Sequence, residues 1–275
     1  MLKLDEKKIR KGKPIGLPYQ GSKKKISKKI VEIIKQNFGT DKPIYDIFGG
    51  GGAITAECML NGLEVHYNDL DKDITDMFQR VISQGREWIK TLIISREEFY
   101  KIKNKADKTV DDNIKLLVNS FGNNKNGYLY SKEWSDMKYN LAIEIIDKHD
   151  VFSGYKKTDT YKNAKTRLQQ LERLQQLERL QPTNLSYEAF YDIEDAIFYL
   201  DPPYENTGHI GYAGSFDSQK FYDWAFEMSK KNIVLVSSYE ISDDRFECVY
   251  EFKTARSTMQ GGAAGNRTEK LFMVV

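Results

Sequence analysis

A short apolar segment followed at once by four glycines is the feature that most constrains the fold of this chain. Residues 43–48 are predicted to form a short buried strand, and the glycines at 49–52 lead into a helix predicted over 53–60. A second strand is predicted at 63–67, and a second helix at 71–83. This alternation is typical of a parallel, doubly wound α/β sheet.

The alternation stops after residue 85 and resumes near residue 196. The intervening sequence predicts helices near 96–104, 111–120 and 136–148, and the glycine- and asparagine-rich stretch at 121–127 is a strong loop signal. We therefore interpret residues 86–165 as an inserted helical lobe and residues 1–85 and 166–275 as one sheet-containing domain.

The second part of the sheet has its own strand and helix signals. A buried strand is predicted at 196–200, a helix at 218–230 and another strand at 232–236. Residues 246–254 and 270–275 read as a closing antiparallel pair. Near the N-terminus, isoleucines at helical spacing predict a helix that starts at Ser22, whose hydroxyl can cap it.

The sequence LQQLER occurs twice in succession, at 168–173 and 174–179. It places a leucine at every third position from 168 to 180. Each step of three turns an α-helix by about 300°, so these leucines do not form a coiled-coil seam. We interpret the repeat as a structural helix whose leucines wrap around its axis and pack on more than one neighbour.

Composition excludes several classes of protein. Of the 275 residues, 40% are hydrophobic and 30% are charged, which indicates a globular chain. No apolar run approaches the roughly eighteen residues of a membrane span, and the first residues lack the apolar stretch of a signal peptide, so we expect a soluble intracellular protein. Two cysteines and three scattered histidines argue against a disulfide framework, a four-cysteine zinc site and a histidine-based metal site.

The charge is unevenly distributed. Residues 1–35 carry eleven Lys and one Arg against three acids, a net of +9, whereas the whole chain is only +2. A basic arm on a mildly acidic body suggests attraction to phosphate. A solubilising tail would look the same, so the composition leaves both readings open.

The strongest chemical signal is the turn Asp201-Pro202-Pro203-Tyr204, which directly follows a buried strand. Ligands of open α/β sheets bind at the carboxyl ends of strands. The Asp201 carboxylate and the rigid Pro202 carbonyl can accept two hydrogen bonds from an exocyclic amino group, and the Tyr204 ring can stack on a base. A rigid turn with a packed tyrosine is the alternative.

The glycine loop is the second signal. Glycines allow close approach of a ligand to the backbone, and the following helix offers its N-terminus. The dinucleotide pattern G-x-G-x-x-G is not matched, which disfavours NAD. The next strand ends in Asn68-Asp69-Leu70-Asp71, where an acid can hold ribose hydroxyls.

With these motifs in this order, the chain resembles the DNA adenine-N6 methyltransferases of the D12 (Dam-like) class that carry a D-P-P-Y motif, over nearly its whole length. The stretch from Pro18 to Lys23 resembles the family element W-A-G-G-K, with Tyr19, Gln20 and Ser22 as departures. Asp71 stands where the family motif N-D-x-N has its last Asn, and Ser186-Tyr187 stands where the family has D-F.

This resemblance implies a Rossmann-like class I methyltransferase sheet with S-adenosylmethionine as cofactor, and an inserted target-recognition lobe. The reaction implied is methyl transfer to N6 of an adenine flipped out of duplex DNA, with no metal ion and no membrane, in the cytoplasm of a bacterial or phage-infected cell. The catalytic residues expected are Asp201, Pro202 and Tyr204. The cofactor-binding residues expected are Tyr19, Lys23, Asp46, Phe48, Gly50, Gly52, Asp69, Tyr187 and Asp201.

DNA contacts are predicted in two places. Lys24 and Lys28 lie in the basic arm and can hold backbone phosphates, although a solvated helix face would have the same composition. Asn123, Asn124, Lys125 and Asn126 lie in the loop of the insert, where they can read base edges or form a polar turn.

Two rival functions remain at this stage. One is methyl transfer to RNA adenine or to a protein glutamine, although a glutamine methyltransferase would be expected to have Asn in place of Asp201. The other is a DNA-binding module without transfer activity, against which the intact acids Asp46, Asp69 and Asp201 argue. The recognition sequence, the oligomeric state and the existence of a partner restriction endonuclease are not specified by the sequence.

Overall fold

The computed structural model describes residues 1–18, 21–149, 168–205, 216–256 and 268–275. Its centre is a six-stranded sheet in the order β2-β1-β3-β4-β6-β5. Strands β2, β1, β3 and β4 run parallel to one another. Strand β6 is antiparallel to β4, and β5 is antiparallel to β6. The strands are β1 (Ile44–Asp46), β2 (Val65–Tyr67), β3 (Ile197–Leu200), β4 (Ile233–Ser238), β5 (Phe246–Arg256) and β6 (Thr268–Val274). The predicted α/β sheet of parallel strands with a closing antiparallel pair is confirmed.

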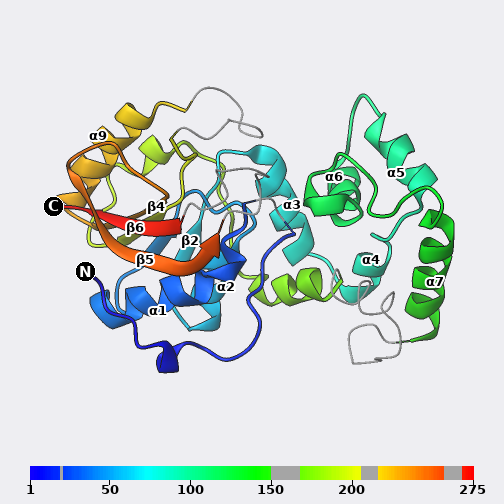
Figure 1. The fold of residues 1–275 in the computed structure, drawn as a ribbon, viewed down its shortest axis with the longest axis horizontal. Coiled ribbons are helices and arrows are strands. Elements are labelled where there is room, and N and C mark those ends of the chain that lie inside the picture. The colour runs from blue at the N-terminus through cyan, green and yellow to red at the C-terminus, as the bar shows by residue number, and fades with distance from the viewer. Residues whose placement is uncertain (19–20, 150–167, 206–215, 257–267) are drawn as a thin grey trace.

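Both faces of the sheet are covered, which explains why β3 is apolar at every position. Ile197 and Tyr199 pack with the helices α1 (Ser27–Phe38) and α2 (Ala53–Leu60). Phe198 and Leu200 point to the other face and pack against α9 (Ser218–Ser229). Figure 1 shows α1 and α2 on one side of the strands and α9 on the other.

The first helix starts later than predicted. Residues Lys23–Lys25 form a separate 3-10 turn, η2, and α1 begins only at Ser27. Ser22 makes no capping hydrogen bond, so its predicted capping role is wrong. The physical reason is the backbone of Ile26, whose φ of −121° and ψ of −6° separate the two elements. The predicted second helix is confirmed as α3 (Lys72–Ile82), capped by the Asp71 carboxylate.

Helices α4 to α7 gather at the end of the molecule away from both termini, with α3 between them and the sheet (Figure 1). Three of them match the predicted helices, while α4 was not predicted because its five residues give no periodic signal. Their bounds are α4 (Arg86–Lys90), α5 (Arg96–Lys103), α6 (Val110–Val118) and α7 (Ser135–Lys148). The remaining 3-10 turns are η1 (Glu6–Lys8), η3 (Phe121–Asn123), η4 (Gln175–Leu177) and η5 (Tyr187–Phe190).

The leucine repeat joins this helical part to the sheet. Its four leucines, and Leu180 directly after it, are buried in one cluster with residues of α3, α6 and α7. Residues 168–174 are α-helical, but the chain then tightens into η4. In a 3-10 helix positions three apart lie on one face, so the spacing of three suits the second half of the repeat. The prediction of one continuous α-helix is therefore wrong. The burial of the leucines supports the predicted structural role.

Two further features of the fold concern the N-terminal segment and the length of the helices. The N-terminal segment lies along the last strands, since Leu2 N donates to Val249 O at 2.8 Å. None of the helices in the described part of the chain is long and apolar enough to cross a membrane.

Candidate active site

Three carboxylates meet where β1, β2 and β3 end. Asp46 is the last residue of β1, Asp69 follows β2 by two residues, and Asp201 follows β3 directly. The chain passes from β2 back across β1 to β3, so this is the point where the strand order reverses. Ligand sites of open α/β sheets form at such points.

Asp69 fixes the glycine loop. Its Oδ2 accepts from Gly50 N at 2.7 Å, and its Oδ1 accepts from Asp71 N at 2.8 Å. Burial raises the pKa of the Asp69 carboxyl to about 6, although these two amides oppose the shift. The carboxylate is therefore held in one orientation at the mouth of the loop.

Gly52 is required by the loop itself. Its φ of 69° is in the left-handed region, and a Cβ there would lie 2.3 Å from Cε2 of Phe78. A Cβ at Gly49 would lie equally close to the ring of Tyr67. Because these two positions have no Cβ, the stacked rings of Tyr67 and Phe78 can pack directly against the loop. Tyr67 OH also donates to Gly50 O at 2.8 Å.

Asp46 lies beneath the loop and is 1% exposed. Its Oδ2 accepts from both the hydroxyl (2.6 Å) and the amide (3.1 Å) of Thr55, the third residue of α2. Burial raises the pKa of Asp46 to about 7, against these hydrogen bonds and with a contribution from Asp201 and Asp69. Asp46 thus links β1 to the helix that follows the glycines.

Asp201 is held from two sides. Lys23 Nζ, from η2, lies 2.6 Å from Oδ2, and Tyr204 OH lies 3.0 Å from Oδ1. Burial raises the pKa of Asp201 to about 6, and Lys23 opposes that shift. Burial also disfavours the Lys23 ammonium, but Asp201 and Glu269 outweigh it and raise the pKa of Lys23 well above its usual value. The two groups form a buried ion pair.

Glu269 is a site residue that the sequence analysis missed. It comes from β6, and its Oε1 lies 2.5 Å from Tyr204 OH, 3.2 Å from Lys23 Nζ and 2.8 Å from Ser237 Oγ. The available signal was weak: Glu269 is the one acid of β6, a strand that also carries Thr268 and Lys270.

An aromatic cluster flanks the glycine loop on the side of α9. The Phe48 and Tyr187 ring centroids are 6.1 Å apart, and Tyr187 packs edge-on against Trp224 at 5.0 Å. Trp224 Nε1 is buried with no acceptor in the described ranges of the chain. A buried donor without a partner is unusual in a folded protein, and a ligand in this cluster could supply the acceptor.

The predicted lysine contacts are partly engaged within the protein. Lys24 Nζ donates to Gln170 at 2.8 Å, and burial lowers the pKa of Lys24 to about 8. Lys28 Nζ donates to Gly12 O at 3.0 Å. Tyr19, the remaining residue predicted for the cofactor site, lies outside the described residues.

The predicted recognition loop lies at η3 in the helical part of the molecule. Asn123 Nδ2 donates to Leu117 O at 3.1 Å, and Asn124 Oδ1 accepts from Asn126 N at 2.9 Å. Asn123 and Lys125 have φ values of 55° and 62°. Some of the polar groups thus form the turn itself, while Asn124 and Asn126 are exposed.

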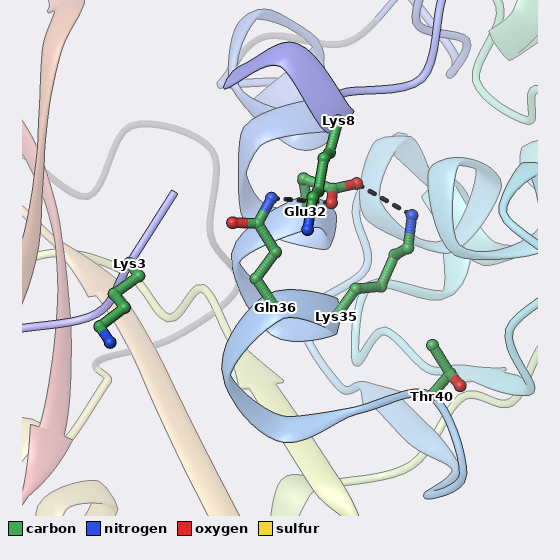
Figure 2. A pocket seen from close by; sticks show the side chains of 6 residues that line it. All are labelled: Lys3, Lys8, Glu32, Lys35, Gln36 and Thr40. Carbon is green, nitrogen blue, oxygen red and sulfur yellow. Dashed lines mark hydrogen bonds and ion pairs between the residues drawn. The ribbon is translucent and has the colours of Figure 1, made fainter. Parts of the chain in front are cut away.

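A separate hollow lies next to α1 (Figure 2). It is lined by lysines, with Glu32 bonded to Lys35 and Gln36, and it contains none of the predicted site residues. The described ranges hold no group of three or more His, Cys, Asp or Glu side chains that could bind a metal ion.

A glycine loop, the acid Asp69 and a D-P-P-Y turn meet at the strand ends, an arrangement that fits an α/β methyltransferase. The sequence matches the family model of D12 class N6 adenine-specific DNA methyltransferases over residues 19–254, and the chain belongs to this family. Membership implies methyl transfer from S-adenosylmethionine to N6 of adenine in DNA.

An rRNA methyltransferase from Streptomyces viridochromogenes is a similar solved structure, with 11% identity over 90% of this chain and 84% of that chain. Its TM-score of 0.39 is too low to support an inference about this chain. No curated protein sequence matches the chain significantly.

Proposed function

We propose that this enzyme binds S-adenosylmethionine over the ends of β1 and β2 and methylates an adenine that has been flipped out of duplex DNA. The observation that carries the proposal is the meeting of Asp69, the glycine loop and the Lys23–Asp201 pair at one sheet edge. Family membership gives the reaction, and this geometry supports the proposal that it takes place at this edge of the sheet.

The residues around the glycine loop fit the cofactor. The fixed Asp69 carboxylate can accept hydrogen bonds from ribose hydroxyls. Gly50 and Gly52 allow the backbone of the loop to approach the cofactor closely. The Phe48 and Tyr187 rings offer apolar surface for the cofactor's adenine, beside Trp224 Nε1, which has no acceptor among the described residues. When bound, the cofactor supplies an electrophilic methyl group on a sulfonium sulfur.

Asp201, Pro202 and Tyr204 act on the acceptor. The Asp201 carboxylate and the Pro202 carbonyl accept the two amino hydrogens of adenine, which orients the nitrogen lone pair toward the methyl group. An amine that attacks a sulfonium methyl needs mainly such positioning and polarisation. Lys23 keeps Asp201 in place and charged, and the Tyr204 ring stacks on the flipped base.

Residues 86–165 form the target-recognition lobe in this proposal, and residues 1–85 and 166–275 form the catalytic domain. Helices α4 to α7 lie together beyond α3, away from the closing strands of the sheet (Figure 1). Lys24 and Lys28 hold DNA phosphates, and the loop from Asn123 to Asn126 reads bases, within the cytoplasm of a bacterial or phage-infected cell.

Transfer of a tritiated methyl group from S-adenosylmethionine tests the proposal on three substrates: duplex DNA, single-stranded DNA and RNA. We expect incorporation into duplex DNA, with N6-methyladenine as the product. Preferential labelling of RNA would replace the proposed substrate. Absence of labelling from all three would favour the DNA-binding module.

A further inference from the structure

The hydroxyl of Tyr204 lies between two carboxylates. It is 3.0 Å from Asp201 Oδ1 and 2.5 Å from Glu269 Oε1. A phenol has one proton and can donate it to one acceptor at a time. Because the shorter contact is the stronger one, Glu269 is the principal acceptor of the Tyr204 proton.

Glu269 is fixed independently of Tyr204. Ser237 Oγ lies 2.8 Å from Oε1 and also faces the Tyr204 hydroxyl, and Lys23 Nζ lies 3.2 Å from the same Oε1. Ser237 belongs to β4, the strand that pairs with β6, and Lys23 belongs to η2. The Glu269 side chain is 11% exposed, so this position is set by the sheet rather than by solvent.

The two oxygens of Asp201 are not equivalent in this arrangement. Oδ2 is occupied by Lys23 at 2.6 Å. Oδ1, which is not neutralised by the ammonium, is therefore the better acceptor for a hydrogen of the substrate amine, and it accepts best when Tyr204 does not also donate to it. Without the Glu269 carboxylate, the Tyr204 proton would turn to Oδ1 and compete with the amine.

We propose that Glu269 is a positioning residue that holds the Tyr204 proton away from Asp201 and so keeps Oδ1 open for the adenine amino group. The inference rests on the proposed role of Asp201 as amine acceptor. Glu269 acts through Tyr204, and it needs no contact with either substrate.

A double-mutant cycle tests this dependence. Glu269→Gln removes the charge but keeps the shape, and Tyr204→Phe removes the hydroxyl but keeps the ring. In the wild-type background we expect Glu269→Gln to lower kcat for DNA methylation by about 10- to 100-fold, the range expected for one charge-assisted hydrogen bond. The Kd for S-adenosylmethionine should be unchanged. In the Tyr204→Phe background, the same substitution should cost less than about threefold.

Equal losses of kcat in the two backgrounds would overturn the inference. If Glu269→Gln does not fold, Ser237→Ala loosens the same carboxylate and is tested in the same cycle. Wild type and Asp201→Ala are measured alongside, because an inactive wild type, or full activity in Asp201→Ala, would count against the proposed function rather than against Glu269.

A second measurement needs no turnover. The Asp201 carboxyl is titrated by carbon-13 NMR in the four proteins of the cycle. If Glu269 diverts the Tyr204 proton, Tyr204→Phe should raise the Asp201 pKa more in the Glu269→Gln background than in the wild-type background. Equal changes in both backgrounds would mean that the hydroxyl does not move to Asp201, and the inference would fail.

Discussion

The Asp69 carboxylate and the Gly50 amide are nineteen residues apart in the chain but only 2.7 Å apart in space. This bond joins the end of β2 to the glycine loop after β1. It means that the acid proposed for the cofactor ribose also orders the loop proposed for the adenosyl group. The two parts of the cofactor site are therefore one structural unit.

Asp69→Ala should weaken S-adenosylmethionine binding by about 1.5–3 kcal/mol, the usual loss for a hydrogen bond to a charged group. Isothermal titration calorimetry measures it. Asp69→Asn can still accept from Gly50 N and separates the charge from the loop contact. Asp73→Ala, at an exposed acid in the first turn of α3, is the matched control. An unchanged Kd for Asp69→Ala would remove Asp69 from the site.

Asp201→Ala should abolish methyl transfer while most DNA affinity remains. The carboxylate acts on the amine in the transition state, whereas DNA affinity comes largely from phosphates elsewhere. The checks are single-turnover methylation and a DNA-binding isotherm. Asp41→Ala changes an exposed aspartate before β1, at the opposite edge of the sheet, and should leave both unaltered. Turnover of Asp201→Ala within about tenfold of wild type would exclude the proposed role.

The rate of transfer should fall on the acid side near pH 6. Asp201 acts as a carboxylate, and burial raises its pKa to about 6, so it gains a proton as the pH drops through that value. An ordinary aspartate would remain active down to its usual value of 3.8. The measurement is kcat/KM from pH 4.5 to 8, with circular dichroism at each pH to confirm folding. A flat profile down to pH 5 would contradict the assignment.

The charged Asp46 carboxylate should lower the free energy of unfolding at high pH. Its pKa is raised to about 7 in the folded state, so the folded protein binds the proton more tightly than the unfolded chain. Stability contributed by the neutral carboxyl is therefore present below about pH 4 and is lost as the pH rises through 7.

Asp46→Asn imitates the neutral form and can still accept from Thr55. It should raise the free energy of unfolding at pH 8, by up to about 4 kcal/mol, and change it much less at pH 4. Urea denaturation of both proteins at the two pH values measures the effect. A variant that is less stable than wild type at pH 8 would show that the charge is compensated in the fold.

Local patterns were enough to predict most of the sheet. The buried strand at 196–200 and the helix at 53–60 have clear beginnings and ends, because glycine, proline and polar residues flank them. The start of α1 was misplaced because η2 bends away to bring Lys23 to Asp201, a contact made across the fold. Tertiary contacts of this kind leave no mark on the local sequence.

The residues of the site could be predicted only where they belong to a recognisable sequence motif. Asp201 stands directly after β3 and Asp69 stands two residues after β2, so the parallel sheet brings both to the same edge. Glu269 reaches the site from the last strand, where the register with β4 decides which side chains face inward. Such pairing over long sequence distances cannot be read from a single sequence, and neither can the intramolecular bonds of Lys24 and Asn123.

The sequence specificity should be altered by changes in the loop at η3. Asn124 is exposed, and an amide can pair with an adenine edge, each good base contact being worth about 1–3 kcal/mol of discrimination. We expect Asn124→Ala to relax or shift the methylated sequence, with cofactor binding unchanged. Asn123→Gly removes that amide too but keeps the left-handed backbone, whereas Asn123→Ala would also strain the turn.

The basic arm should behave differently from this loop. Lys28→Ala and Lys24→Ala should weaken binding to all DNA sequences alike and reduce the slope of log K against log salt by about one per lost phosphate contact. Both lysines have a partner within the protein, but burial lowers the pKa of Lys24 to about 8 and so weakens its charge, and its effect should therefore be the smaller of the two. Sequencing that maps N6-methyladenine after each change separates the two roles. A methylated motif that is unaltered in both asparagine variants would place specificity outside this loop, and a changed motif in Lys28→Ala would show that the arm reads bases as well as phosphates.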